Sequence, residues 1–101
     1  MTRYQISGDA KADLDGIWNY IADRAGAETA SQFIWKFDQT FASIAASPRA
    51  GVNSPDLPPG DVRRFPMGNY LIYYRVLSGK ILISRVLHGK RAPGRAFRQK
   101  A

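Results

Sequence analysis

Apolar side chains in the first half of the chain recur every three or four residues, a spacing that places them on one face of an α-helix. The first stripe is Leu14, Ile17, Trp18, Ile21 and Ala25, and the second is Ala30, Phe33, Ile34, Phe37, Phe41, Ile44 and Ala45. Ser7 is a suitable N-cap for the first helix, and Gly26 fits its end. The second helix ends before Pro48, because proline disfavours helical geometry in the preceding residue. The short link predicts an antiparallel helical hairpin.

The rest of the chain shows strand patterns rich in β-branched and aromatic residues. The predicted strands are Tyr4–Ile6, Val62–Phe65, Tyr70–Leu77 and Lys80–Leu87, with a loop at 48–60 and turns at 66–69 and around Ser78-Gly79. The order β-α-α-β-β-β predicts an α+β two-layer sandwich, with the helical hairpin on one face of a mainly antiparallel sheet. Turns of two and three residues at Ser78 would give opposite registers, so both strand parities remain open.

Nothing else in the chain is predicted to cover the second face of this sheet. We therefore expect an open face with arginines and tyrosines on it, which is typical of a binding surface.

The composition indicates one small domain. With 101 residues the chain can form a single two-layer core, and residues 1–91 are expected to form it, followed by a basic tail at 92–101. The chain has no cysteine, which fits a reducing cytoplasm, and it lacks both a membrane-spanning run and the apolar region of a signal peptide.

The positive charge is concentrated in the second half of the chain. Residues 1–47 contain four cations and six anions, whereas residues 48–101 contain eleven cations and two anions, so the net charges are −2 and +9. This asymmetry indicates an acidic partner, either nucleic acid or an acidic protein.

Four sequence motifs resemble those of the ParE branch of the ParE/RelE superfamily of bacterial type II toxins. The first helix carries Asp13-Leu14 with Ile17-Trp18 and Tyr20-Ile21, and the second helix is followed by Pro48-Arg49-Ala50-Gly51. The other two motifs lie in the predicted strands and run from Val62 to Val76 and from Arg85 to Arg91. After Arg91 many ParE relatives have an acidic residue, whereas this chain continues Ala92-Pro93-Gly94.

The resemblance implies a RelE-like fold and a toxin encoded with an acidic, ribbon-helix-helix ParD-like antitoxin. It implies inhibition of DNA gyrase by binding rather than by enzymatic activity, a heteromeric toxin–antitoxin complex that contacts DNA mainly through the antitoxin, and a role in plasmid or chromosome stabilisation or in the stress response. The RelE relatives are ribosome-dependent mRNA endonucleases, which gives one alternative function. A basic nucleic-acid-binding domain is another.

The residues favour binding over catalysis. Metal-independent RNA cleavage needs an acid, a base and cations on the phosphate, and His88 is the only side chain with an ordinary pKa near neutrality. No Asp, Glu or Tyr follows Tyr74, so a second acid or base near His88 is not expected. The ring of His88 could instead bond a backbone carbonyl. One histidine without cysteine leaves no metal-ligand spacing, and neither a metal nor a cofactor is expected.

Two sets of residues are candidates for binding. The target-binding set comprises Arg63, Arg64, Arg75, Arg85, His88, Lys90 and Arg91. Arg85 is expected either on the open sheet face or stacked on Tyr73 or Tyr74, and Arg63 and Arg64 should point to opposite faces. The antitoxin-binding set comprises Trp35, Trp18 and Tyr20, and Trp35 lies well away from the apolar stripe of its helix.

Overall fold

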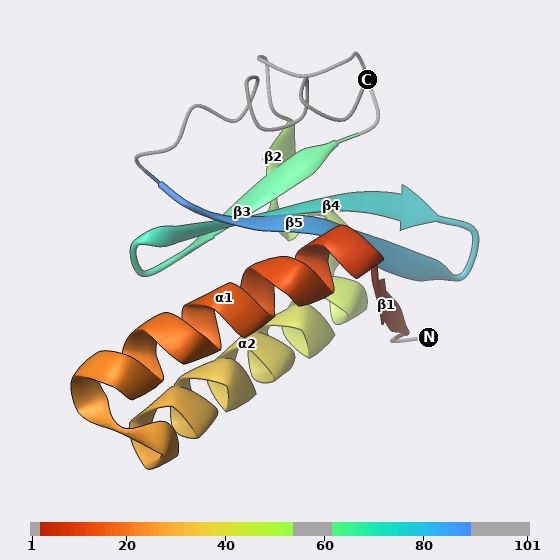
Figure 1. Cartoon of the computed structure of the whole chain (residues 1–101). Coiled ribbons are helices and arrows are strands. Elements are labelled where there is room, and N and C mark those ends of the chain that lie inside the picture. The colour runs from red at the N-terminus through yellow and green to blue at the C-terminus, as the bar shows by residue number, and fades with distance from the viewer. Residues whose placement is uncertain (1–2, 54–61, 90–101) are drawn as a thin grey trace.

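The computed structural model describes residues 3–53 and 62–89. The elements are β1 (Tyr4–Ile6), α1 (Gly8–Ala25), α2 (Ala27–Ala46), a one-turn 3-10 helix η1 (Pro48–Ala50), β2 (Val52–Asn53), β3 (Arg63–Met67), β4 (Tyr70–Leu77) and β5 (Lys80–His88). In Figure 1 both helices lie on one face of the sheet. The predicted two-layer α+β fold is confirmed.

The sheet has five strands in the order β1-β5-β4-β3-β2. Only β1 runs parallel to its neighbour, β5, and all other pairs are antiparallel. The first and last strands of the chain are therefore adjacent, which fixes the amino terminus of α1 beside β5. The sheet is mainly antiparallel, as predicted.

The helix boundaries follow from the expected capping residues. The Ser7 side chain accepts a hydrogen bond from the Ala10 amide at 3.0 Å, as an N-cap does. Gly26 ends α1 with a φ of 94°, a left-handed conformation that costs glycine little. The link between the helices is this single residue.

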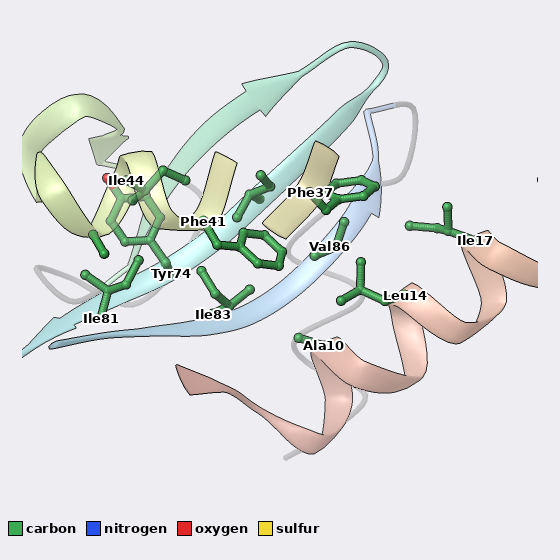
Figure 2. Close-up of a cluster of buried hydrophobic side chains, with 12 residues drawn as sticks. Ala10, Leu14, Ile17, Phe37, Phe41, Ile44, Tyr74, Ile81, Ile83 and Val86 are labelled. Atoms are coloured by element: carbon green, nitrogen blue, oxygen red, sulfur yellow. The ribbon is translucent and has the colours of Figure 1, made fainter. Parts of the chain in front are cut away.

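The main core lies between the helical hairpin and the sheet. Figure 2 shows the side chains that meet there: Ala10, Leu14 and Ile17 from α1, Phe37, Phe41 and Ile44 from α2, and Tyr74, Ile81, Ile83 and Val86 from the strands. The β4–β5 turn has two residues, since Leu77 pairs with Lys80. This register places Ile72 and Tyr74 of β4 toward the helices and answers the parity question that the sequence left open.

A β-bulge in β5 interrupts the alternation of its side chains. Tyr73 pairs with Arg85 but its neighbour Tyr74 pairs with Ile83, so one extra residue enters β5 at Ser84. As a result Ile83 and Val86, three residues apart, both contribute to the core on the helical side.

Two expectations about the connections between elements need correction. The loop at 48–60 begins with η1 and the two-residue strand β2, which are too short to leave a periodic pattern. Pro66 and Met67 belong to β3, and the turn is confined to Gly68-Asn69. Proline is tolerated there because β2 pairs only with the first two residues of β3, leaving the outer side of Pro66 without a strand neighbour among the described residues.

The second face of the sheet is not fully open, contrary to expectation. Tyr73, Val62 and Leu87 form a second buried cluster there, with Leu71 packed against it, and Tyr73 is fully buried. The expectation assumed that only a helix or strand could bury this face, and Val62 itself lies outside the regular elements.

Candidate partner-binding surfaces

Arg63 and Tyr74 hold the segment that follows α2. The Tyr74 hydroxyl donates to the Pro48 carbonyl at 2.7 Å and accepts from the Gly51 amide at 2.9 Å. The Arg63 guanidinium donates to the Gly51 carbonyl at 2.6 Å and to the Arg49 carbonyl at 3.3 Å. These hydrogen bonds hold residues 48–51, between α2 and β2, against β3 and β4.

Gly51 is required at this position because of close packing. A Cβ atom there would lie 2.5 Å from the Tyr74 hydroxyl oxygen and 2.6 Å from the Arg64 carbonyl oxygen. Two of the quoted sequence motifs thus meet in one contact, in which Pro48 and Gly51 from one and Arg63 and Tyr74 from the other take part. We conclude that the residues of these two motifs have a structural role in this contact.

Arg85 has a structural role as well. Its guanidinium forms two hydrogen bonds with the Asp13 carboxylate of α1, at 2.7 and 2.9 Å, and its side chain is only 11% exposed. The hydrogen bond to Asp13 raises the pKa of Arg85 above its ordinary value. The expectations that Arg85 lies on an open face or stacks on a tyrosine are therefore wrong, although Tyr73 is its cross-strand neighbour.

Asp13 and Ser7 complete the edge of β5 where β1 ends. The short strand β1 pairs with β5 only at residues 81–83. Beyond it, the Ser7 hydroxyl donates to the Ser84 carbonyl at 3.0 Å, and the Val86 amide donates to Asp13 at 2.9 Å. Backbone polar groups at a sheet edge need such partners. The Asp13 carboxylate therefore accepts the hydrogen bond from Val86 that a neighbouring strand would otherwise accept.

A groove lies between α1 and the end of β5, which we call the α1 groove. Its volume is about 730 Å³, and it is lined by Ala12, Asp13, Gly16, Ile17, Tyr20, Asn69, Tyr70, Val86, Leu87 and His88. Tyr20 is 55% exposed and lies under the Arg24 guanidinium, 4.3 Å from the ring centroid. The groove thus joins one antitoxin candidate, Tyr20, with one target candidate, His88.

His88 has a titratable neighbour that sequence reasoning missed. Tyr70 is its cross-strand partner, and the two rings meet edge to face with centroids 5.5 Å apart. Burial, and secondarily the nearby Tyr20, raises the pKa of Tyr70 above its ordinary value. No Asp, Glu or Tyr follows Tyr74 in the sequence, but hairpin pairing brings the earlier residue Tyr70 to His88.

The two tryptophans share a seam on the helical hairpin. The Trp18 indole N–H donates to the Ser31 hydroxyl at 3.2 Å, and Trp35 lies one helical turn beyond Ser31 on the same side of α2. Trp35 is 60% exposed, while Trp18 is half-buried. We call Trp18, Ser31 and Trp35 the tryptophan seam. Tyr20 lies roughly 200° around α1 from Trp18, so it is not part of this seam.

A second hollow, the arginine hollow, lies where α2 ends. Its volume is about 830 Å³, and it is lined by Ser47, Pro48, Arg49, Arg63, Arg75, Val76 and Leu77. It unites two of the target candidates with Arg49, which sequence reasoning did not select because Arg49 lies in the predicted loop. Arg64, opposite Tyr73, belongs to the second face of the sheet, and Lys90 and Arg91 lie outside the described residues.

Within the described residues, no group of three or more histidine, cysteine or acidic side chains could hold a metal ion. The helices of this part of the chain are also too short or too polar to cross a membrane.

A family profile described as "ParE toxin of type II toxin-antitoxin system, parDE" matches residues 4–93. The chain is 39% identical over 88 residues to Toxin ParE1 of Caulobacter vibrioides, an alignment that covers 87% of this chain and 90% of that protein. It is 35% identical over 88 residues to Toxin ParE1 of Mycobacterium tuberculosis, covering 86% and 89%. The chain belongs to the ParE toxin family. It is thus a toxin of the type II toxin–antitoxin class, as the four sequence motifs implied.

Solved structures share the fold of this ParE-family chain. One described as "Chromosomal ParDE TA system from P. aeruginosa" superposes with a TM-score of 0.74 at 23% identity, covering 87% of this chain and 96% of that one. The isolated RelE toxin of E. coli superposes with a TM-score of 0.58 at 14% identity, covering 99% and 97%. The RelE-like fold is confirmed.

Proposed function

We propose that this ParE-family toxin inhibits DNA gyrase in the cytoplasm by binding to it, and that a ParD-type antitoxin neutralises it. The observation that carries the proposal is the match to the ParE toxin profile, which runs through the whole described fold from β1 to β5. The structural neighbour from a ParDE system supports the antitoxin partner.

The exposed aromatic side chains support a protein partner on the helical side. The tryptophan seam and the α1 groove both lie on the helical hairpin, and tryptophan and tyrosine are frequent anchors of protein interfaces. An antitoxin segment that crosses over α1 from the seam into the groove would cover Tyr20 and His88 together. Acidic residues of the antitoxin would face the second half of the chain, whose net charge is +9, because residues 1–47 carry −2.

An assay with purified gyrase tests the proposal. Purified toxin is expected to inhibit supercoiling and to increase the amount of cleaved DNA, and an equimolar amount of cognate antitoxin is expected to reverse both effects. In cells, expression of the toxin alone should slow growth and induce the DNA-damage response while bulk mRNA stays intact. Rapid mRNA cleavage without DNA breaks would contradict the proposal.

The His88–Tyr70 pair favours a second candidate function, a ribosome-dependent mRNA endonuclease. A neutral imidazole could accept the proton of the RNA 2′-hydroxyl, and the Tyr70 phenol beside it could donate a proton to the leaving oxygen, although burial raises its pKa and makes it a weaker acid. This function predicts codon-specific mRNA cleavage on translating ribosomes. The cleavage should disappear in His88→Ala, while it should persist in a Lys11→Ala control that changes an exposed cation on α1.

A further inference from the structure

The arginine hollow exists because the β4–β5 hairpin is longer than the helical layer. In Figure 1 the β4–β5 turn extends past the last turn of α2. Val76 has the same strand parity as the core residue Tyr74, yet it is 50% exposed, and Leu77 is 40% exposed. Val76 and Leu77 point to opposite faces of β4, so the strand end that lines the hollow exposes an aliphatic side chain on each of its sides.

The charge of the hollow is of one sign. Its lining contains three arginines and, within the described residues, no acidic side chain. The carboxyl end of α2 contributes a partial negative charge of about half a unit, which three full positive charges outweigh. An anionic group is therefore favoured in this hollow.

The three arginines differ in how they are held. Arg63 is fixed by its bonds to the Arg49 and Gly51 carbonyls. The side chains of Arg49 and Arg75 are exposed, and neither forms a hydrogen bond to another described residue. Both can turn toward a carboxylate and bind it with two parallel N–H donors, the strongest geometry for such a pair.

We propose that the arginine hollow is where the toxin contacts its target, and that it takes an acidic protein segment bearing an aliphatic side chain. This inference rests on the proposed function, because it makes the occupant a segment of gyrase. Val76 and Leu77 favour protein over nucleic acid, since the described residues that line the hollow include no aromatic ring on which a base could stack. The tryptophan seam and the α1 groove share no lining residue with the hollow, so the antitoxin has a separate surface.

Charge reversal at the two exposed arginines tests the proposal. The variant Arg49→Glu/Arg75→Glu should weaken gyrase inhibition by more than about tenfold, measured with the intact gyrase tetramer. Its affinity for the cognate antitoxin should change by less than about threefold, because distant surface charges contribute little. The control Arg3→Glu/Lys11→Glu makes the same change in net charge at exposed positions outside the hollow and should retain inhibition. Leu77→Ala should weaken inhibition without any change of charge.

Four results separate the possible outcomes. If wild-type toxin inhibits gyrase and the double variant inhibits it equally well, this inference is overturned while the proposed function stands. An equal loss of antitoxin affinity would assign the hollow to the antitoxin and overturn the inference too. So would duplex DNA alone binding the wild type and losing affinity in parallel with gyrase inhibition. If wild-type toxin does not inhibit gyrase at all, the proposed function itself fails.

Discussion

Arg85 and Arg75 lie on neighbouring strands of one sheet, but their surroundings differ. Arg85 is close to α1, and the Asp13 carboxylate binds its guanidinium with two hydrogen bonds. Arg75 lies beyond the helical layer and is exposed beside Val76 and Leu77. The first arginine connects a helix to a strand, whereas the second can reach a partner. In a basic chain the net charge therefore overestimates the charge available for binding, because part of it already has an internal partner.

The Asp13 side of this comparison predicts the largest loss of stability. Asp13→Ala would leave Arg85 charged and only 11% exposed, and would also remove the partner of the Val86 amide. We expect a decrease of about 2–3 kcal/mol in the free energy of unfolding, measured by urea denaturation. Asp15→Ala, at an exposed position of the same helix, is the control and should change stability by less than about 0.5 kcal/mol. An equally stable Asp13→Ala variant would mean that the Arg85 contact is not structural.

Gly51→Ala tests the contact that holds Arg63 and Tyr74. The added methyl group would collide with the Tyr74 hydroxyl and the Arg64 carbonyl, and the rigid backbone of β3 cannot move away easily. Overpacking of this kind costs about 1–3 kcal/mol, and we expect thermal unfolding to show a loss near the middle of that range. At Gly16 a Cβ meets no atom within 4 Å, and Gly16→Ala should stabilise α1 by about 0.5–1 kcal/mol. Equal behaviour of the two variants would contradict the close packing at Gly51.

The sequence predicted those parts of the fold that depend on periodicity and local capping. Ser7, Gly26 and most of both helical stripes hold their expected places, although Ala25 of the first stripe is exposed, and β4 has the predicted ends. The bulge at Ser84 could not be predicted, because strand pairing determines it and the pattern of one strand does not. The same bulge lies next to Arg85, the cation whose environment was predicted wrongly.

The candidate sites were harder to predict than the fold. The Arg85–Asp13 pair joins residues that are 72 positions apart, and the arginine hollow joins Arg49 of η1 with Arg75 of β4. The composition gives the number of charged residues, but it does not show which of them lie together in the fold. The assignment of target-binding and antitoxin-binding residues stays a prediction, and the next two variants test it.

Trp35→Ala should affect binding without affecting stability. The side chain is 60% exposed on the tryptophan seam, so its loss removes little core packing. If Trp35 is an anchor for the antitoxin, the dissociation constant measured by isothermal titration should rise more than about tenfold, or about 1.4 kcal/mol. Val52→Ala is a suitable control, because Val52 is similarly exposed but lies in β2, away from the seam. Unchanged affinity in both variants would remove Trp35 from the antitoxin surface.

His88→Ala should have the smallest effect, a modest decrease in toxicity. His88 is exposed at the end of β5 with its ring against Tyr70, so alanine removes the ring contact with Tyr70 and leaves the core intact. If the toxin acts by binding, growth inhibition at matched expression should weaken by less than about tenfold, because one peripheral contact contributes little affinity. Removal of a general acid or base would instead lower a cleavage rate by about a hundredfold or more. His88→Gln, which keeps a polar side chain of similar length, provides the comparison. A folded His88→Ala protein without any toxicity, accompanied by an equally inactive His88→Gln protein, would show that His88 takes part in chemistry and would favour the endonuclease.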